Sequence, residues 1–268
     1  MNKNLIASAI VGLGLAASGS ASAIVVAGVD YGSLGTTNHI ETTTVAESFI
    51  NGNGQQLKGY GQINTVNGNI SYAGGDRLFF VFDQYVSNSF TPGTSGSVNF
   101  TGGQVRVYLK PNFNLLDQSS AANIALIDTG TPYVIYSGHG MNGTTNTLQA
   151  LGRLTGATIS FTGSGLADVT GGLPAVVAYL NSNGIGDGVG GFADIALTTS
   201  GNNAVLNPFD NTTGCQTLEG GSSGQFCIAG DASIRGLTAR AVPEPGVLGL
   251  VGLGLLGMGI SLRKRKAA

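Results

Sequence analysis

The central part of the chain alternates between apolar and other side chains, as expected for strands that face a core on one side and water on the other. The clearest case is the segment 104–110, in which Val105, Val107 and Leu109 alternate with Gln, Arg, Tyr and Lys residues. Residues 55–65 repeat this period of two. Residues 77–86 are the most hydrophobic stretch between the two chain ends and predict a central strand. The pattern indicates an antiparallel sheet.

Short turn sequences separate these stretches. The Asn-Gly-Asn sequence at 67–69 is a strong hairpin signal. The two glycines at 102–103 predict a turn between strands at 97–101 and 104–110. Further strands are expected at 24–29, 148–161, 192–198 and 233–240.

Helical signals are few. Residues 173–180 predict one short helix, because Pro174 stands where a first helical residue belongs and apolar residues recur at spacings of three and four. Residues 31–53 suggest an irregular or weakly helical segment, while 121–127 and 133–136 fit either strands or helical turns. Many short strands with Gly, Asn and Ser turns predict an all-β fold, a β-sandwich or jelly-roll-like domain with one short helix.

The N-terminal end predicts export. Lys3 precedes a short apolar run, and Ala21 and Ala23 form a small-x-small cleavage site. This pattern is typical of a signal peptide, residues 1–23, which is read by the Sec machinery and removed. A permanent N-terminal anchor is the weaker alternative, because glycines interrupt the apolar run. Cleavage leaves residues 24–241 as the exported domain.

The C-terminal end combines three features in order. Two prolines keep the tetrapeptide Val242, Pro243, Glu244 and Pro245 extended, because each proline fixes φ and removes a backbone donor. Residues 246–262 are uncharged and just long enough to predict a transmembrane helix. Four cations then predict a stop-transfer signal that stays cytoplasmic: Arg263, Lys264, Arg265 and Lys266.

This arrangement, over residues 242–268, resembles the PEP-CTERM sorting signal of Gram-negative bacteria. The resemblance implies an exosortase as partner, a transient tether in the inner membrane, and a final place at the cell surface or in the extracellular matrix. Such proteins are typically exported by cells that make exopolysaccharide and form biofilms or flocs. The Gly/Asn/Thr-rich body also broadly resembles flocculation-associated PEP-CTERM proteins. The alternative is an ordinary C-terminal membrane anchor, although an anchor needs no Pro-Glu-Pro.

Charge argues against nucleic acid as a partner. Residues 24–241 carry seven Lys and Arg against thirteen Asp and Glu, so no basic stripe is available to neutralise phosphates. Two cysteines, Cys215 and Cys227, predict a local disulfide in an oxidising compartment, worth about 3 kcal/mol in the chain-entropy model. A metal site is not expected, because the two cysteines have no histidine near them in sequence.

Several partial matches to catalytic motifs occur. Ser222 lies in a Gly-x-Ser-x-Gly sequence without the flanking strand and helix of a nucleophile elbow. The glycines at 186, 188 and 191 match a dinucleotide fingerprint without a βαβ unit. In a chain with 45 glycines, such matches are expected by chance.

The histidines and carboxylates offer further candidates. His139 could be combined with Asp128 or Asp168 in a catalytic set, although it stands between two glycines and reads more simply as a turn residue. Asp76 with Asp83, or Asp187 with Asp194, could pair for glycoside hydrolysis, and Asn181, Asn183 and Asp187 could bind calcium. Solvated turn residues are the simpler interpretation of all of them.

Six tyrosines could stack on sugar rings or pack between strands: Tyr60, Tyr72, Tyr85, Tyr108, Tyr133 and Tyr136. The sequence thus predicts a non-enzymatic, exosortase-sorted surface or matrix protein with a structural or adhesive role and no cofactor. A polysaccharide-binding module, or a polysaccharide-directed hydrolase, is the alternative.

Overall fold

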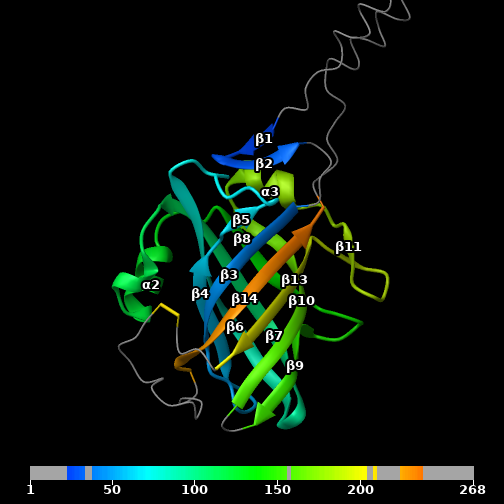
Figure 1. Ribbon diagram of the computed structural model, residues 1–268. Coiled ribbons are helices and arrows are strands. Elements are labelled where there is room, and N and C mark those ends of the chain that lie inside the picture. The colour runs from blue at the N-terminus through cyan, green and yellow to red at the C-terminus, as the bar shows by residue number, and fades with distance from the viewer. Residues whose placement is uncertain (1–22, 34–37, 156–157, 204–207, 210–223, 238–268) are drawn as a thin grey trace, which may run out of the picture.

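The computed structural model describes residues 23–33, 38–155, 158–203, 208–209 and 224–237. Ten antiparallel strands form the main sheet (Figure 1). They are β3 (Asn38–Ser48), β4 (Gln56–Gln62), β5 (Thr65–Val66), β6 (Asp76–Thr91), β7 (Gly93–Pro111), β8 (Val134–His139), β9 (Asn146–Thr155), β10 (Thr158–Gly172), β13 (Ile195–Asn202) and β14 (Phe226–Gly236).

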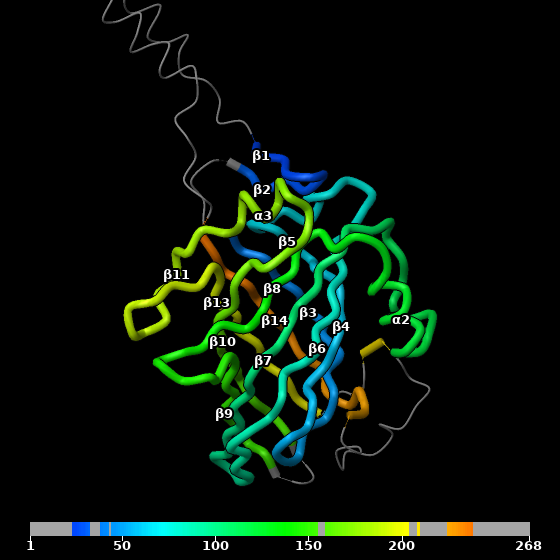
Figure 2. Tube along the Cα trace, turned by 180° about the vertical axis from the view of Figure 1, so that it is seen from behind, coloured from blue at the N-terminus to red at the C-terminus, as the bar shows by residue number. Residues whose placement is uncertain are grey.

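The main sheet closes on itself. Its strand order runs from β13 through β14, β3, β4, β6, β7 and β8 to β10, and β10 then pairs with β13. In that closing pair, Ser160–Ala167 lie opposite Ile195–Asn202 without interruption. The strands therefore surround an interior, and both views show them running around it (Figures 1 and 2).

Smaller elements lie at one end of this closed sheet and on its flanks. The hairpin of β1 (Ala23–Val26) and β2 (Val29–Ser33) lies above helix α3 (Pro174–Leu180) at one end, where Tyr31 contacts Tyr179 with ring centroids 4.9 Å apart (Figure 1). The short hairpin of β11 (Ile185–Gly186) and β12 (Phe192–Ala193) projects from the side.

Helix α2 covers part of the outer surface. A 3₁₀ turn, η1 (Leu115–Asp117), leads into α2 (Ser120–Ile127). The Ser119 hydroxyl caps the start of α2 by accepting a hydrogen bond from the Ala122 amide. Tyr60 donates to the Ser120 hydroxyl at 2.9 Å, and Phe79 stacks on Phe113. This outer layer is a second apolar core, separate from the one inside the sheet.

The local predictions that rest on strong signals are confirmed. The fold is all-β, β6 contains the predicted strand at 77–86, and α3 begins with Pro174 at its first position. The predicted turn at 67–69 is present, with Asn67 and Gly68 both at positive φ.

Other predictions are wrong. Ten of the described strands form one closed sheet, whereas a β-sandwich or jelly roll has two packed sheets. Two short α-helices occur within the described residues, since residues 120–127 form α2 as well. Residues 38–48, predicted to be irregular, form β3, and residues 24–29 contribute to two strands joined by a turn at 27–28.

The predicted turn at Gly102–Gly103 is also wrong. These glycines lie inside one continuous strand, β7, where both have positive φ. The ring of Tyr85 occupies the space that a side chain on Gly103 would need. At these glycines the strand bends. Before the bend β7 pairs with β9, and after it β7 pairs with β8, so the two glycines allow one long strand to pair with two different strands along its length.

Candidate functional site

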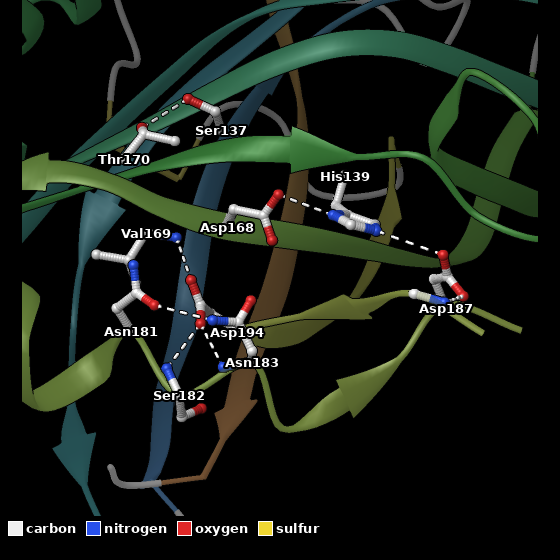
Figure 3. A network of polar contacts seen from close by, with 11 residues as sticks. Ser137, His139, Asp168, Val169, Thr170, Asn181, Ser182, Asn183, Asp187 and Asp194 are labelled. Atoms are coloured by element: carbon white, nitrogen blue, oxygen red, sulfur yellow. Dashed lines mark hydrogen bonds and ion pairs between the residues drawn. The ribbon is translucent and has the colours of Figure 1, made fainter. Parts of the chain in front are cut away.

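The structure brings His139 and Asp168 together at the outer surface. His139 ends β8 and Asp168 lies on the neighbouring strand β10, and the His139 Nδ1 atom is 2.7 Å from the Asp168 carboxylate (Figure 3). On the other side of the ring, Nε2 is 3.7 Å from Asp187 in the β11–β12 hairpin. The histidine is thus held between two carboxylates.

The protonation states of this group follow from its hydrogen bonds. The bond to Asp168 is the main cause of a raised pKa at His139, and the nearby Asp187 adds to it. The Asp187 carboxylate accepts hydrogen bonds from the backbone amides of Val189 and Gly191. These bonds, and the neighbouring His139, lower the pKa of Asp187. The imidazole between the two carboxylates joins the hairpin to the sheet.

We expect an NMR titration to give His139 a pKa above that of an exposed histidine. Asp168→Asn should lower this pKa, because it removes the charged acceptor, whereas Ser137→Ala on the same strand should leave it unchanged. A raised folded pKa stabilises the fold below the unfolded value of about 6.5, and this contribution is lost as the pH rises through the folded pKa. An unchanged pKa in Asp168→Asn would contradict the assignment.

Asp194 is a structural carboxylate. It is buried, and it accepts the backbone amides of Val169, Ser182 and Asn183, each at 2.7 Å (Figure 3). These bonds fix the segment that follows α3 against β10. Asp187 and Asp194 therefore have separate sets of partners.

The other predicted chemical groups are not assembled either. Asn183 hydrogen-bonds Asn181 and both lie beside Asp194, away from the loop amides that Asp187 accepts (Figure 3). In the described part of the chain, no three metal-ligating side chains converge. The glycines of the dinucleotide match lie in or beside the β11–β12 hairpin, which does not lead from a strand into a helix.

Asp128 and Asp83 belong to an ion-pair network on the opposite flank. Arg106 on β7 binds Asp83 on β6 at 2.9 Å and Asp128, the residue that ends α2, at 3.0 Å. Tyr108 also donates to Asp128. This network attaches α2 to the sheet, so Asp128 does not orient His139, and Asp83 has Arg106 as its partner rather than Asp76.

A feature that sequence reasoning missed lies inside the closed sheet. Glu47 on β3 is 3 % exposed and lines two apolar cavities, of about 60 Å³ and about 30 Å³. Its Oε1 atom accepts from the Thr199 hydroxyl at 3.3 Å, and its Oε2 atom has no hydrogen-bond partner among the described residues. Burial raises the pKa of Glu47 to about 8.

A sequence signal for Glu47 was available. Ile40 and Thr42 face the interior, and after an irregularity in the pairing with β14 so do Val45 and Glu47. A glutamate at an inward position of a β-branched, alternating segment is the pattern of a buried carboxyl.

Other predicted residues lie outside the described part of the chain. They are the signal peptide up to Ser22, Ser222, the sorting tetrapeptide, residues 246–262 and the four terminal cations. Cys227 is buried in β14 but Cys215 is among the residues not described, so their disulfide stays a prediction. Within the described segments, no helix is long and apolar enough to span a membrane.

Comparison with protein families identifies the C-terminal signal. The family model of the PEP-CTERM protein-sorting motif matches residues 241–266. This confirms the resemblance inferred from the Pro-Glu-Pro sequence, the apolar run and the basic tail, and it supports an exported protein sorted by an exosortase. No curated protein and no solved structure matches the chain.

Proposed function

We propose that this protein is a structural or adhesive component of the cell surface or extracellular matrix, associated with exopolysaccharide in biofilm or floc formation. The observation that carries the proposal is the sorting motif at 241–266, which directs an exported protein to an exosortase. The motif determines how the protein is sorted, and the exported domain performs its function after sorting.

The described domain supports a non-enzymatic role. Five of the six carboxylates considered for catalysis are engaged in structural contacts: Asp83 and Asp128 with Arg106, Asp168 and Asp187 with His139, and Asp194 with backbone amides. Ser137, the hydroxyl two residues before His139, pairs with Thr170 at 2.8 Å on the same surface (Figure 3). A closed sheet also has fewer free strand edges, which suits a protein exposed outside the cell.

Direct polysaccharide binding is the second candidate. Exposed hydroxyl contacts link neighbouring strands on the outer surface, such as Thr198 with Ser233 at 2.8 Å and Ser200 with Asp231 at 2.6 Å. The hydroxyls and the carboxylate in these contacts can exchange hydrogen bonds with a sugar polymer. The six tyrosines do not add stacking platforms, because all of them are buried.

The sorting step is tested by mass spectrometry of the protein from its producing cells. We expect one product cut near residue 23 and near the Pro-Glu-Pro sequence. Replacing Pro243, Glu244 and Pro245 with alanine should leave the C-terminal segment attached and the protein in the membrane fraction. Asp76→Ala, which removes an exposed carboxylate, should be processed normally.

The functional step is tested separately by deleting the gene. We expect reduced cell aggregation and less exopolysaccharide retained in the matrix, both restored by the wild-type gene but not by the alanine variant. Normal aggregation and matrix retention after deletion would overturn the proposed role, even if processing occurs as expected.

A further inference from the structure

Uncharged segments cover the end of the closed sheet at which the β1–β2 hairpin and α3 lie (Figure 1). Residues 23–29 and 173–186, which contain β1 and α3, include no charged side chain. Val25 on β1 is 62 % exposed, and Ile70, in the turn between β5 and β6, is 67 % exposed. The exposed side chains of α3 are also apolar: Pro174, Ala175 and Ala178.

Hydrogen bonds join these segments into one surface. The Tyr133 hydroxyl, at the start of β8, donates to the Val26 carbonyl of the hairpin at 2.8 Å. The Asn67 side chain, in the turn before Ile70, donates to the Tyr31 carbonyl at 2.7 Å. Val25 and Ile70 are therefore held on the same rigid end of the domain. We call this surface, formed by residues 23–33, 67–70 and 173–180, the end surface.

The chain also leaves the described domain at this end. β14 ends at Gly236, which pairs with Asn38 at the start of β3 and with Ile195 at the start of β13. The next residue, Leu237, is 44 % exposed and packs beside Gly184, which follows α3. The sorting motif at 241–266 begins a few residues later. The end surface is thus the part of the domain nearest to the segment that implies membrane-anchored sorting.

The length of the connection decides which end of the domain can face the membrane. From Leu237 to the start of the apolar run at Gly246, the chain spans at most about 30 Å even when fully extended. β6 contains 16 residues. A strand of that length rises about 50 Å, or about 35–40 Å along the axis of the closed sheet at a tilt of ~40°. The connection is therefore too short for the opposite end to face the bilayer while the chain is tethered.

We propose that the end surface is a membrane-contact surface, which lies on the lipid bilayer while the chain is tethered, with Val25 and Ile70 inserted among the headgroups. Apolar side chains on a surface segment bind a bilayer in this way. Arg77 and Arg235 at this end are offset by Asp30 and Asp76, so the contact is apolar and does not need anionic lipid. The proposal rests on the sorting route and not on the proposed role in the matrix.

The test uses tryptophan fluorescence, because the chain contains no tryptophan and one substitution creates a single reporter. Val25→Trp and Ile70→Trp place it on the end surface. Leu151→Trp is the matched control, since Leu151 is 53 % exposed on β9 at the opposite end (Figure 1). Each full chain, with Pro243, Glu244 and Pro245 replaced by alanine so that the tether is kept, is reconstituted into zwitterionic vesicles with or without lipids brominated on their acyl chains.

Bromine quenches tryptophan on contact, so brominated lipid should lower the emission of Val25→Trp and Ile70→Trp about twofold and leave that of Leu151→Trp unchanged. Adding Val25→Asp to Ile70→Trp should abolish the quenching, whereas adding Leu151→Asp should not. All three positions are more than half exposed, so the fold tolerates these changes.

Four outcomes would overturn the proposal. The full chain could fail to stay with the vesicles, or the three reporters could be quenched equally or not at all. Quenching of Ile70→Trp that persists with Val25→Asp would show that the tether alone places this end near lipid. A blue shift of the end-surface reporters without quenching would show that a protein, such as a second copy of this chain, covers the surface. None of these results bears on aggregation of the producing cells, which tests the matrix role separately.

Discussion

Glu47→Leu is expected to stabilise the protein above pH 8 and to change its stability much less near pH 4. Burial raises the pKa of Glu47 from 4.5 to about 8, with the Asp231 charge contributing and the Thr199 hydrogen bond opposing. Below the unfolded pKa the carboxyl is neutral in both states and folding carries no ionisation penalty. As the pH rises towards 8, the unfolded chain ionises first, and the folded state loses about 5 kcal/mol relative to it.

The measurement is urea unfolding of the wild type and Glu47→Leu at intervals from pH 4 to pH 9. The difference between their free energies of unfolding isolates Glu47, because His139, Asp128 and Asp187 titrate in both proteins. Glu47→Gln is the matched control, since it keeps the size of the side chain but cannot ionise, and it should show the same loss of pH dependence. A difference between wild type and variants that stays constant with pH would contradict the buried, neutral state of Glu47.

The parts of the fold that were predictable from sequence are those that depend on neighbouring residues. The strand at 77–86 follows from its own hydrophobic run, α3 from Pro174 and apolar spacing, and the turn at 67–69 from Asn-Gly. The sorting signal was predictable for the same reason, because its three features are consecutive in the chain. Local sequence predicts local backbone geometry well where a residue with a strong conformational preference, such as Pro or Asn-Gly, determines it.

The parts that were not predictable depend on residues far apart. Closure joins β10 to β13, and no local pattern indicates that pairing. His139 and Asp168 meet only because β8 and β10 are neighbours. The segment 38–48 contains Asn, Glu and Ala, which are depleted in strands and weaken a strand prediction. It becomes β3 because β14 and β4 pair with it on either side.

The bend at Gly102–Gly103 could not be predicted from sequence for a different reason. Two glycines favour positive φ, but they do this equally in a hairpin turn and inside a bent strand. The choice between the two is made by tertiary packing, since β6 continues to pair with β7 on both sides of the bend. The ring of Tyr85 fills the space above Gly103, so the bend and the packing of the interior are coupled.

Gly103→Ala is therefore expected to destabilise the protein by about 2–5 kcal/mol. Gly103 has a φ of +95°, where an alanine is strained, and its Cβ would come within 2.1–2.4 Å of three atoms of the Tyr85 ring. Strain at such a φ costs about 1 kcal/mol or more, and overpacking of a core adds about 1–3 kcal/mol. The midpoint of urea unfolding should fall while its slope stays the same.

Gly68→Ala separates the two contributions. Gly68 also has positive φ, at +77°, but a Cβ there would meet no atom within 4 Å. It should lose about 1 kcal/mol, which is the strain alone. In a Tyr85→Ala background, Gly103→Ala should cost about as little as Gly68→Ala, because the ring that opposes the new methyl group is absent. Equal losses for Gly103→Ala and Gly68→Ala in the wild type would show that Tyr85 moves freely, and that the bend in β7 is set by the backbone without help from the ring.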